Sequence, residues 1–212
     1  MPNAGKLEMR VRGPNVTPGY WKSPELTAAA FDEEGFYRMG DALKFADPAD
    51  PSRGLLFDGR VAEDFKLATG TWVSVGALRA TLIAAGAPVV QDVVITGHDR
   101  DDAGALIFPA LDACRKLAAD AGGDVPAGAL LADSAVRATF QSVLDRLSRE
   151  STGSANRIAC ALLMEHPPSL DAGEATDKGS LSQRMILQNR AALVEELYRT
   201  PPSARTLVAA RK

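Results

Sequence analysis

The stretch that decides the fold lies at residues 57–76 and reads Phe57-Asp58-Gly59-Arg60-Val61-Ala62-Glu63-Asp64-Phe65-Lys66-Leu67-Ala68-Thr69-Gly70-Thr71-Trp72-Val73-Ser74-Val75-Gly76. A strand-like segment, Leu55 to Phe57, leads into it, and a helical pattern starts after it at Ala77. Between these apolar segments, four ionisable side chains fall within seven residues: Arg60, Glu63, Asp64 and Lys66. Spacing alone leaves two interpretations open: a solvated linker, or a junction of two bodies at which a polar ligand can approach.

Short strands and one helix precede this junction. Residues 6–12 alternate apolar and charged side chains, which predicts a half-buried strand. Ser23-Pro24-Glu25 has the cap, proline and acid of a helix start. Further strands are predicted from Phe36 to Phe45 and at residues 55–57. These strands are few, and strands need partners in a sheet to be stable. We therefore expect residues 1–58 to be an incomplete, β-rich piece of a larger domain.

Helical and strand patterns are mixed in the segment after the junction, and together they predict an α+β fold. Val89 to Ile95 and Gly104 to Phe108 read as two strands of a hairpin. Asp133-Ser134 can cap an amphipathic helix. The remaining predictions are helices at residues 77–85, 111–121 and 180–198 and a buried strand at 158–164. We expect one domain over residues 59–200 and a flexible tail at 201–212.

The composition is that of an ordinary globular protein. The chain has 212 residues, 46% of them hydrophobic and 24% charged, with a net charge of -3. Neither this charge nor any basic stripe suggests a nucleic-acid partner, and we expect no membrane span. The two cysteines, Cys114 and Cys160, lack metal-ligand spacing, so we expect reduced, partly buried thiols, no metal site and a cytoplasmic protein.

Three motifs in this order resemble the C-terminal part of the adenylate-forming acyl-CoA ligases: Gly35 to Asp41, Gly59 to Ser74, and Thr176 to Gly179. The second motif looks most like the feruloyl-CoA synthetase branch of that superfamily. The resemblance implies that residues 1–58 end the large AMP-binding domain and that residues 59–200 form the small mobile domain.

The resemblance also implies roles for three charged residues. Asp41 would hold the ribose hydroxyls of ATP, and Arg60 would contact the nucleotide. Lys178 would be the catalytic lysine, which stabilises charge that builds during adenylate formation. Without the family pattern, Asp41 reads as an ordinary turn residue, Arg60 as a surface partner of Glu63 or Asp64, and Lys178 as a solvated loop lysine. Acids near Lys178 could hold it charged and away from the site: Asp171, Glu174 and Asp177.

Between these residues the resemblance implies a hinge and a thiol-facing loop. The hinge position is Ala62, which lacks the usual polar side chain, and Glu63 is the weaker candidate to replace it. Lys66, Thr69 and Gly70 match the part of the family that faces the pantetheine tunnel. This loop is one residue longer than the common form, so its individual contacts do not transfer.

The implied cofactors are ATP or AMP with Mg²⁺ and coenzyme A, and the implied substrate is an aromatic, hydroxycinnamate-like acid. The family's phosphate-binding loop and acyl pocket are not in these residues, so the implied partner is a missing N-terminal domain. We expect the chain alone to be inactive and to expose an apolar edge within residues 1–58. A non-catalytic binding module that docks on a protein partner, and a ligase for another aryl or fatty acid, are the alternatives.

Overall fold

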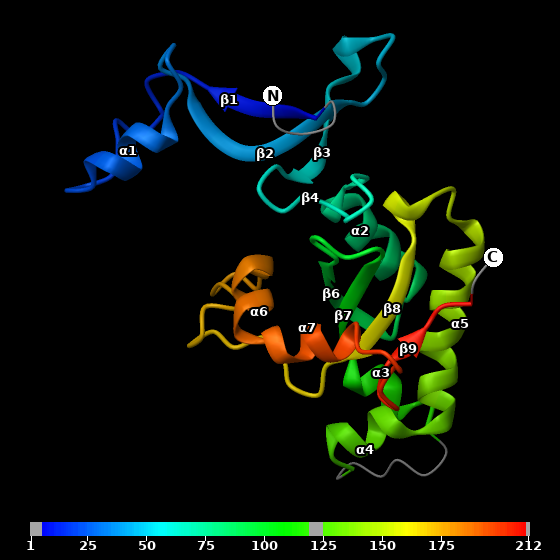
Figure 1. Ribbon diagram of the computed structural model, residues 1–212. Coiled ribbons are helices and arrows are strands. Elements are labelled where there is room, and N and C mark those ends of the chain that lie inside the picture. Colours follow the sequence, from blue (N-terminus) through cyan, green and yellow to red (C-terminus); the bar gives the residue numbers. More distant parts are fainter. Residues whose placement is uncertain (1–5, 119–124, 211–212) are drawn as a thin grey trace. The chain divides into compact units, whose positions relative to one another are not determined.

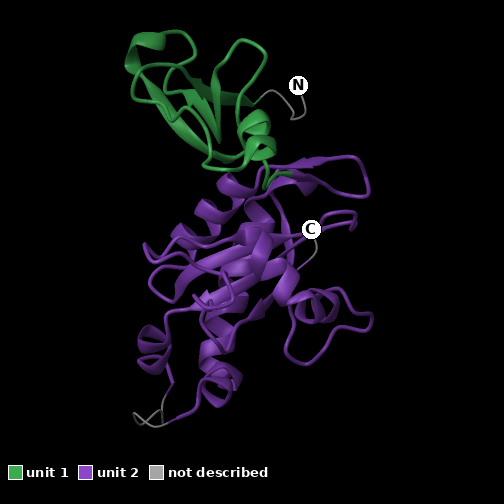
Figure 2. Ribbon diagram, turned by 90° about the vertical axis from the view of Figure 1, so that its left-hand side faces the viewer, with its two compact units in different colours: residues 1–64 green, residues 65–212 purple. Residues whose placement is uncertain are grey.

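The computed structural model describes residues 6–118 and 125–210 and divides the chain into two compact units, residues 1–64 and 65–212 (Figure 2). We expected the second domain to begin at residue 59, but the unit begins at Phe65. The reason lies in contacts of residues 61–64 with the first unit. The Val61 N–H donates to the Gly40 carbonyl oxygen at 2.9 Å, and Asp64 pairs with Lys6 at 2.6 Å.

The first unit is built on an antiparallel sheet with the order β1-β2-β3 (Figure 1). Its elements are β1 (Leu7–Val11), α1 (Pro24–Ala30), β2 (Tyr37–Phe45), the 3-10 turn η1 (Pro51–Arg53) and β3 (Leu55–Arg60). The strands and the helix predicted for this region are confirmed. Helix α1 has no buried residue.

Apolar side chains are poorly covered in the first unit. Ala42 is its one fully buried apolar residue among those described. Large apolar side chains are exposed, among them Leu7, Tyr20, Trp21, Leu26, Met39, Phe45, Leu55, Leu56 and Phe57. This agrees with the apolar surface expected within residues 1–58. Hydrogen bonds of the sheet, rather than a core, define this unit.

The second unit is a four-stranded sheet between two layers of helices (Figure 1). The sheet has the order β6-β7-β8-β9, with β7 and β8 parallel and the other two pairs antiparallel. A separate small hairpin pairs β4 (Phe65–Lys66) with β5 (Trp72–Val73). The sheet strands are β6 (Val90–Thr96), β7 (Ala103–Pro109), β8 (Ile158–Leu163) and β9 (Leu207–Val208).

The helices of this unit cover opposite faces of the sheet. Along β7, Ile107 points into a core shared with α2 and α5, whereas its neighbour Leu106 points into a core shared with α6 and α7. This is the alternation that a strand imposes on its side chains. The helices are α2 (Val75–Ala85), α3 (Leu111–Arg115), α4 (Ala127–Ala132), α5 (Ser134–Glu150), α6 (Gln183–Asn189) and α7 (Ala191–Leu197), with the 3-10 turn η2 (Ser154–Asn156). The mixed α+β fold is as predicted.

Local sequence signals located most of these elements correctly. The β6–β7 hairpin and the buried strand β8 are confirmed. Helix α5 is capped as expected, because the Asp133 side chain accepts hydrogen bonds from the N–H groups of Ala135 and Val136. Helix α3 ends at Arg115, short of the predicted helix, whose last residues lie outside the described part of the chain.

Two predictions near the C-terminus are wrong. The single last helix is two helices, α6 and α7, because the backbone leaves helical geometry at Arg190, with φ -106° and ψ 28°. The tail at residues 201–212 is ordered where it is described. Strand β9 pairs with β8 through Leu207, which is buried, and the Ala209 N–H donates to the Ala159 carbonyl oxygen at 2.9 Å.

No described helix is both long enough and apolar enough to cross a bilayer.

Candidate functional site

Asp41 and Arg60 face each other in the first unit. They are paired residues of β2 and β3, and Arg60 Nε lies 3.6 Å from Asp41 Oδ1. Each follows a glycine with positive φ, Gly40 at 73° and Gly59 at 90°, a conformation that other residues adopt at a cost. Arg60 is 67% exposed as a side chain, so its guanidinium can exchange this neighbour for a ligand. Sequence motifs nineteen residues apart therefore form one polar pair.

The backbone that follows this pair turns at the predicted hinge. The Glu63 N–H donates to the Arg60 carbonyl oxygen at 3.1 Å, and Ala62 lies within this turn. A hinge role for Ala62 and Glu63 stays a prediction.

A buried lysine anchors the end of the turn, and the sequence did not reveal it. Lys6 Nζ lies 2.6 Å from Asp64 Oδ2 and donates to the Asp58 carbonyl oxygen at 2.8 Å. The side chains of Lys6 and Asp64 are 11% and 4% exposed. Alternation had put Lys6 on the polar face of its strand, and no local signal paired it with a carboxylate 58 residues later.

The second group of predicted residues lies on the small β4–β5 hairpin. The Leu67 N–H donates to the Thr71 carbonyl oxygen at 2.9 Å, and Gly70 turns the chain with φ 82°. Lys66 and the tip residues Thr69 and Gly70 are exposed. Lys66 Nζ lies 5.1 Å from the centre of the Trp72 ring, a cation–π contact that holds the ammonium group over the hairpin.

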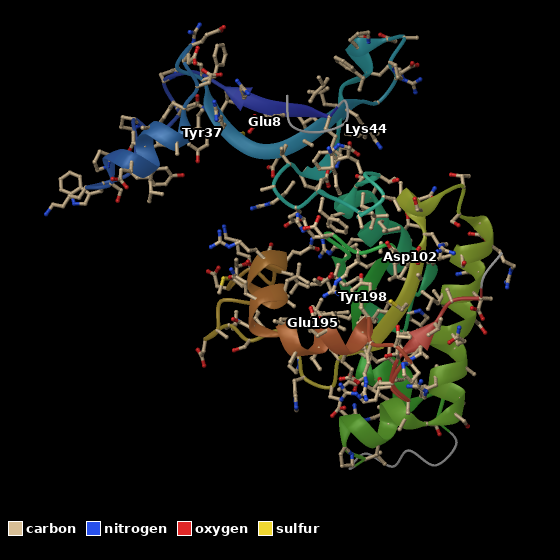
Figure 3. The ribbon with its side chains drawn as sticks, in the orientation of Figure 1. Glu8, Tyr37, Lys44, Asp102, Glu195 and Tyr198 are labelled. Carbon is tan, nitrogen blue, oxygen red and sulfur yellow. The ribbon has the colours of Figure 1, made fainter. Side chains whose placement is uncertain are left out.

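The turn between β6 and β7 contacts the β4–β5 hairpin through a backbone hydrogen bond. The Ala68 N–H donates to the Arg100 carbonyl oxygen at 2.8 Å. The Arg100 side chain pairs with Glu195 of α7 and lies 5.1 Å from the centre of the Tyr198 ring. Tyr198 Oη in turn donates to the Asp102 carbonyl oxygen at 3.2 Å; Glu195, Tyr198 and Asp102 are labelled in Figure 3. The hairpin is thus fixed to the helical layer through one turn.

Lys178 lies at the exposed tip of a second, tighter turn, in the segment between β8 and α6. Ala175 and Leu181 form an isolated β-bridge. Within it the Thr176 N–H donates to the Ser180 carbonyl oxygen at 2.9 Å, and Gly179 has φ 78°. No ion pair joins Lys178 to another residue in the part of the chain that the structure describes. Its ammonium group is available to a ligand.

The acid nearest the base of this turn, Glu174, has a different partner from the one we considered. Arg190 donates to both of its carboxylate oxygens, Nε to Oε1 at 3.0 Å and Nη2 to Oε2 at 2.7 Å. These hydrogen bonds lower the pKa of Glu174 against the opposing effect of burial, and the Ser169 N–H adds to the lowering. The hypothesis that Glu174 holds Lys178 is therefore wrong.

The two cysteines lie in the core clusters of the second unit. Cys114 and Cys160 are buried free thiols, and burial raises the pKa of Cys160 to about 12. Among the described residues, no cluster of three or more His, Cys, Asp or Glu side chains could hold a metal ion.

Residues 66–201 match the family described as AMP-binding enzyme C-terminal domain. The long-chain-fatty-acid–[acyl-carrier-protein] ligase AEE15 of Arabidopsis thaliana is 23% identical over 205 residues, which are 93% of this chain and 26% of that protein. The malonate–CoA ligase ACSF3 of Bos taurus is 36% identical over 90 residues, which are 42% of this chain and 14% of that protein. The chain therefore spans about a quarter or less of these relatives.

Among solved structures, the A-PCP didomain of carboxylic acid reductase from Segniliparus rugosus, in complex with AMP, has a similar fold. The TM-score is 0.67 at 25% identity, and the match covers 92% of this chain and 25% of that chain. Because only a small part of the chain lies outside the match, the similarity includes residues of both units.

Proposed function

Because the chain belongs to the AMP-binding enzyme C-terminal domain family, we propose that it is the C-terminal part of an ATP-dependent acid–thiol ligase. In the first half-reaction a carboxylate oxygen attacks the α-phosphorus of ATP, pyrophosphate leaves and an acyl-adenylate forms. In the second, a thiol attacks the acyl carbonyl carbon, AMP leaves and a thioester forms. Mg²⁺ bound to ATP would supply neutralisation of the phosphate charge, and the described residues of this chain offer no cluster of acidic, His or Cys side chains to hold it.

The observation that carries this proposal is the position of Lys178. Negative charge develops on the phosphate and carboxylate oxygens during adenylate formation, and a preorganised cation stabilises it. Lys178 lies at the tip of a hydrogen-bonded turn and has no ion pair with a described residue. A fixed backbone with an uncommitted ammonium group is what this charge stabilisation requires.

Asp41 and Arg60 suit the nucleotide. A carboxylate accepts two hydrogen bonds from a vicinal diol, and a guanidinium offers donors to ribose or phosphate oxygens. Their side chains lie on adjacent strands and are partly or largely exposed. We assign them to the ribose and the nucleotide, respectively.

For the acid we propose a hydroxycinnamate such as ferulate, and for the thiol acceptor coenzyme A. The support is the sequence resemblance of residues 59–74 and the exposed hairpin that carries Lys66, Thr69 and Gly70. The second candidate is a fatty acid passed to a carrier-protein thiol, favoured by the relative named as an acyl-carrier-protein ligase. We place the reaction in the cytoplasm on composition and reduced thiols.

The test uses the ligase in which this chain functions and its K178A variant. Acid-dependent exchange of pyrophosphate into ATP reports adenylate formation, with ferulate, a long-chain fatty acid and malonate as competing substrates. We expect exchange with ferulate and a loss of about 10²–10³-fold in K178A, by analogy with the loss of one transition-state donor. Normal pyrophosphate exchange in K178A contradicts the proposed role of Lys178. Exchange with the fatty acid but not with ferulate contradicts only the proposal that the substrate is a hydroxycinnamate.

Two separate assays test the identity of the thiol acceptor and whether the 212-residue chain is active by itself. Thioester formation from a synthetic acyl-adenylate distinguishes coenzyme A from a carrier protein bearing phosphopantetheine. The 212-residue chain by itself should release no pyrophosphate with ferulate and ATP. Robust turnover by the chain alone would contradict the proposal that it is one part of a larger catalytic unit.

A further inference from the structure

Glu174 and Arg190 form a buried ion pair at the base of the segment that carries Lys178. Their side chains are 4% and 13% exposed, and two parallel hydrogen bonds join them. Burying two charges is costly unless the geometry is good and the remaining donors and acceptors are satisfied. A pair of this kind is weak evidence for added stability, so its contribution is better sought in the geometry it fixes.

Arg190 ties together parts of this segment that are distant in sequence. Nη1 donates to the His166 carbonyl oxygen at 3.0 Å, and Nη2 to the Pro167 carbonyl oxygen at 2.9 Å. The guanidinium also lies 5.0 Å from the centre of the Phe108 ring, on a core strand. One side chain therefore fastens the start of the segment, Glu174 and the sheet to one another.

Glu174 fastens the turn itself. Its N–H donates to the Ser169 carbonyl oxygen at 2.8 Å, and its own carbonyl oxygen accepts from the Ser182 N–H at 2.8 Å. Its carboxylate also accepts from the Ser169 N–H at 3.0 Å. The bridge between Ala175 and Leu181 begins at the next residue, so the Lys178 turn is attached directly to this anchored position.

We propose that Glu174 and Arg190 are positioning residues for Lys178 in adenylate formation. The inference rests on the proposed function. Lys178 has no ion pair with a described residue to direct it, so the location of its ammonium group depends on the turn, and the location of the turn depends on this pair. A small displacement of a catalytic group lowers a rate steeply, by about 10²-fold for 1 Å.

The first experiment uses the 212-residue chain and measures trypsin cleavage after Lys178. E174Q removes the ionised acceptor, and R190K removes the two-pronged geometry while keeping the charge. We expect cleavage at Lys178 to rise by about tenfold or more in both, because hydrogen bonds to charged groups then no longer hold the turn closed. E196Q is the matched control. It weakens another two-pronged pair, between Glu196 of α7 and Arg205, which precedes β9. Equal cleavage in wild type and both variants would contradict the inference.

The second experiment separates positioning from folding in the ligase. E174Q and R190K should lower pyrophosphate exchange by about 10²-fold. They should leave thioester formation from synthetic acyl-adenylate unchanged, since Lys178 acts on the first half-reaction. The double variant E174Q/K178A should be no worse than K178A, because residues that act as a unit are not additive. Equal losses of rate in both half-reactions would refute the inference that Glu174 and Arg190 position Lys178. A loss in E174Q/K178A equal to the product of the two single losses would refute it as well.

Failure of the inference can be told from failure of the proposed function. Normal exchange in K178A overturns the proposed role of Lys178 and this inference with it. Normal exchange in E174Q beside a defective K178A overturns the inference alone. E196Q should retain normal exchange in either case, because its pair does not touch the Lys178 turn.

Discussion

Replacing Leu207 with alanine removes the side chain through which β9 joins the core, and we expect the second unit to lose about 2–3 kcal/mol of its free energy of unfolding. Leu207 is 3% exposed and belongs to the core cluster that α5 shares with the sheet. The value lies at the lower end for buried leucine because β9 is a two-residue strand at the edge of the sheet.

The cavity should nevertheless persist, because hydrogen bonds from α5 hold the backbone of this segment in place. Gln141 Nε2 donates to the Val208 carbonyl oxygen at 2.8 Å, and Ser148 Oγ to the Ala210 carbonyl oxygen at 2.9 Å. The Ala210 N–H donates to Asp145 Oδ1 at 2.8 Å. Since the backbone cannot follow the missing side chain inward, most of the lost contact is not recovered.

The assay is thermal unfolding of the 212-residue chain followed by circular dichroism. For a unit of this size the loss corresponds to a midpoint lower by about 4–12 °C. V208A is the control, because Val208 is the adjacent residue of the same strand and is 48% exposed. We expect it to cost about 0.5 kcal/mol or less. Equal midpoints for the two variants would refute the packed strand and restore a flexible tail.

Three further results are expected. The pKa of Glu174 is lowered in the folded state, so its pair with Arg190 stabilises the fold at pH values above the ordinary pKa of 4.5. This contribution disappears as the pH falls through the folded-state pKa of Glu174. The unfolding midpoint of E174Q should therefore depend less on pH below 4.5 than that of wild type. Because burial raises the pKa of Cys160 to about 12, iodoacetamide at pH 8 should alkylate it only after unfolding, and rapid labelling of native protein would contradict this. In the ligase, R60K should raise the KM for ATP by about 10- to 100-fold, since an ammonium group cannot replace the fork; an unchanged KM would remove Arg60 from the nucleotide site.

Elements whose cause is local could be predicted from the sequence. Helix α5 has its cap, Asp133, directly before its first turn, and strand β1 shows the alternation of a half-buried strand. The residues proposed for the site were found by motif, and the pairing of Asp41 with Arg60 follows once β2 and β3 are adjacent.

Elements whose cause is distant in sequence could not be predicted. The break at Arg190 has no glycine or proline to signal it, and the partner that uses this residue, Glu174, lies 16 residues earlier. Strand β9 has two residues, too few to show a period, and it exists because β8 and α5 offer it partners. The Lys6–Asp64 pair joins residues 58 positions apart. Single-sequence patterns carry no information on such pairs.

The charged residues of this chain divide into two kinds, and on the proposed function this division explains how Lys178 can be placed accurately. Lys6 with Asp64, and Glu174 with Arg190, are buried pairs that hold backbone at the predicted hinge and at the Lys178 turn. Arg60 and Lys178 are exposed and therefore free to bind a charged ligand. A buried pair breaks rarely, because separating it leaves an uncompensated charge, whereas an exposed charge exchanges partners at little cost. Accuracy thus comes from the buried pairs, and the chemistry we propose comes from the exposed residues that they position.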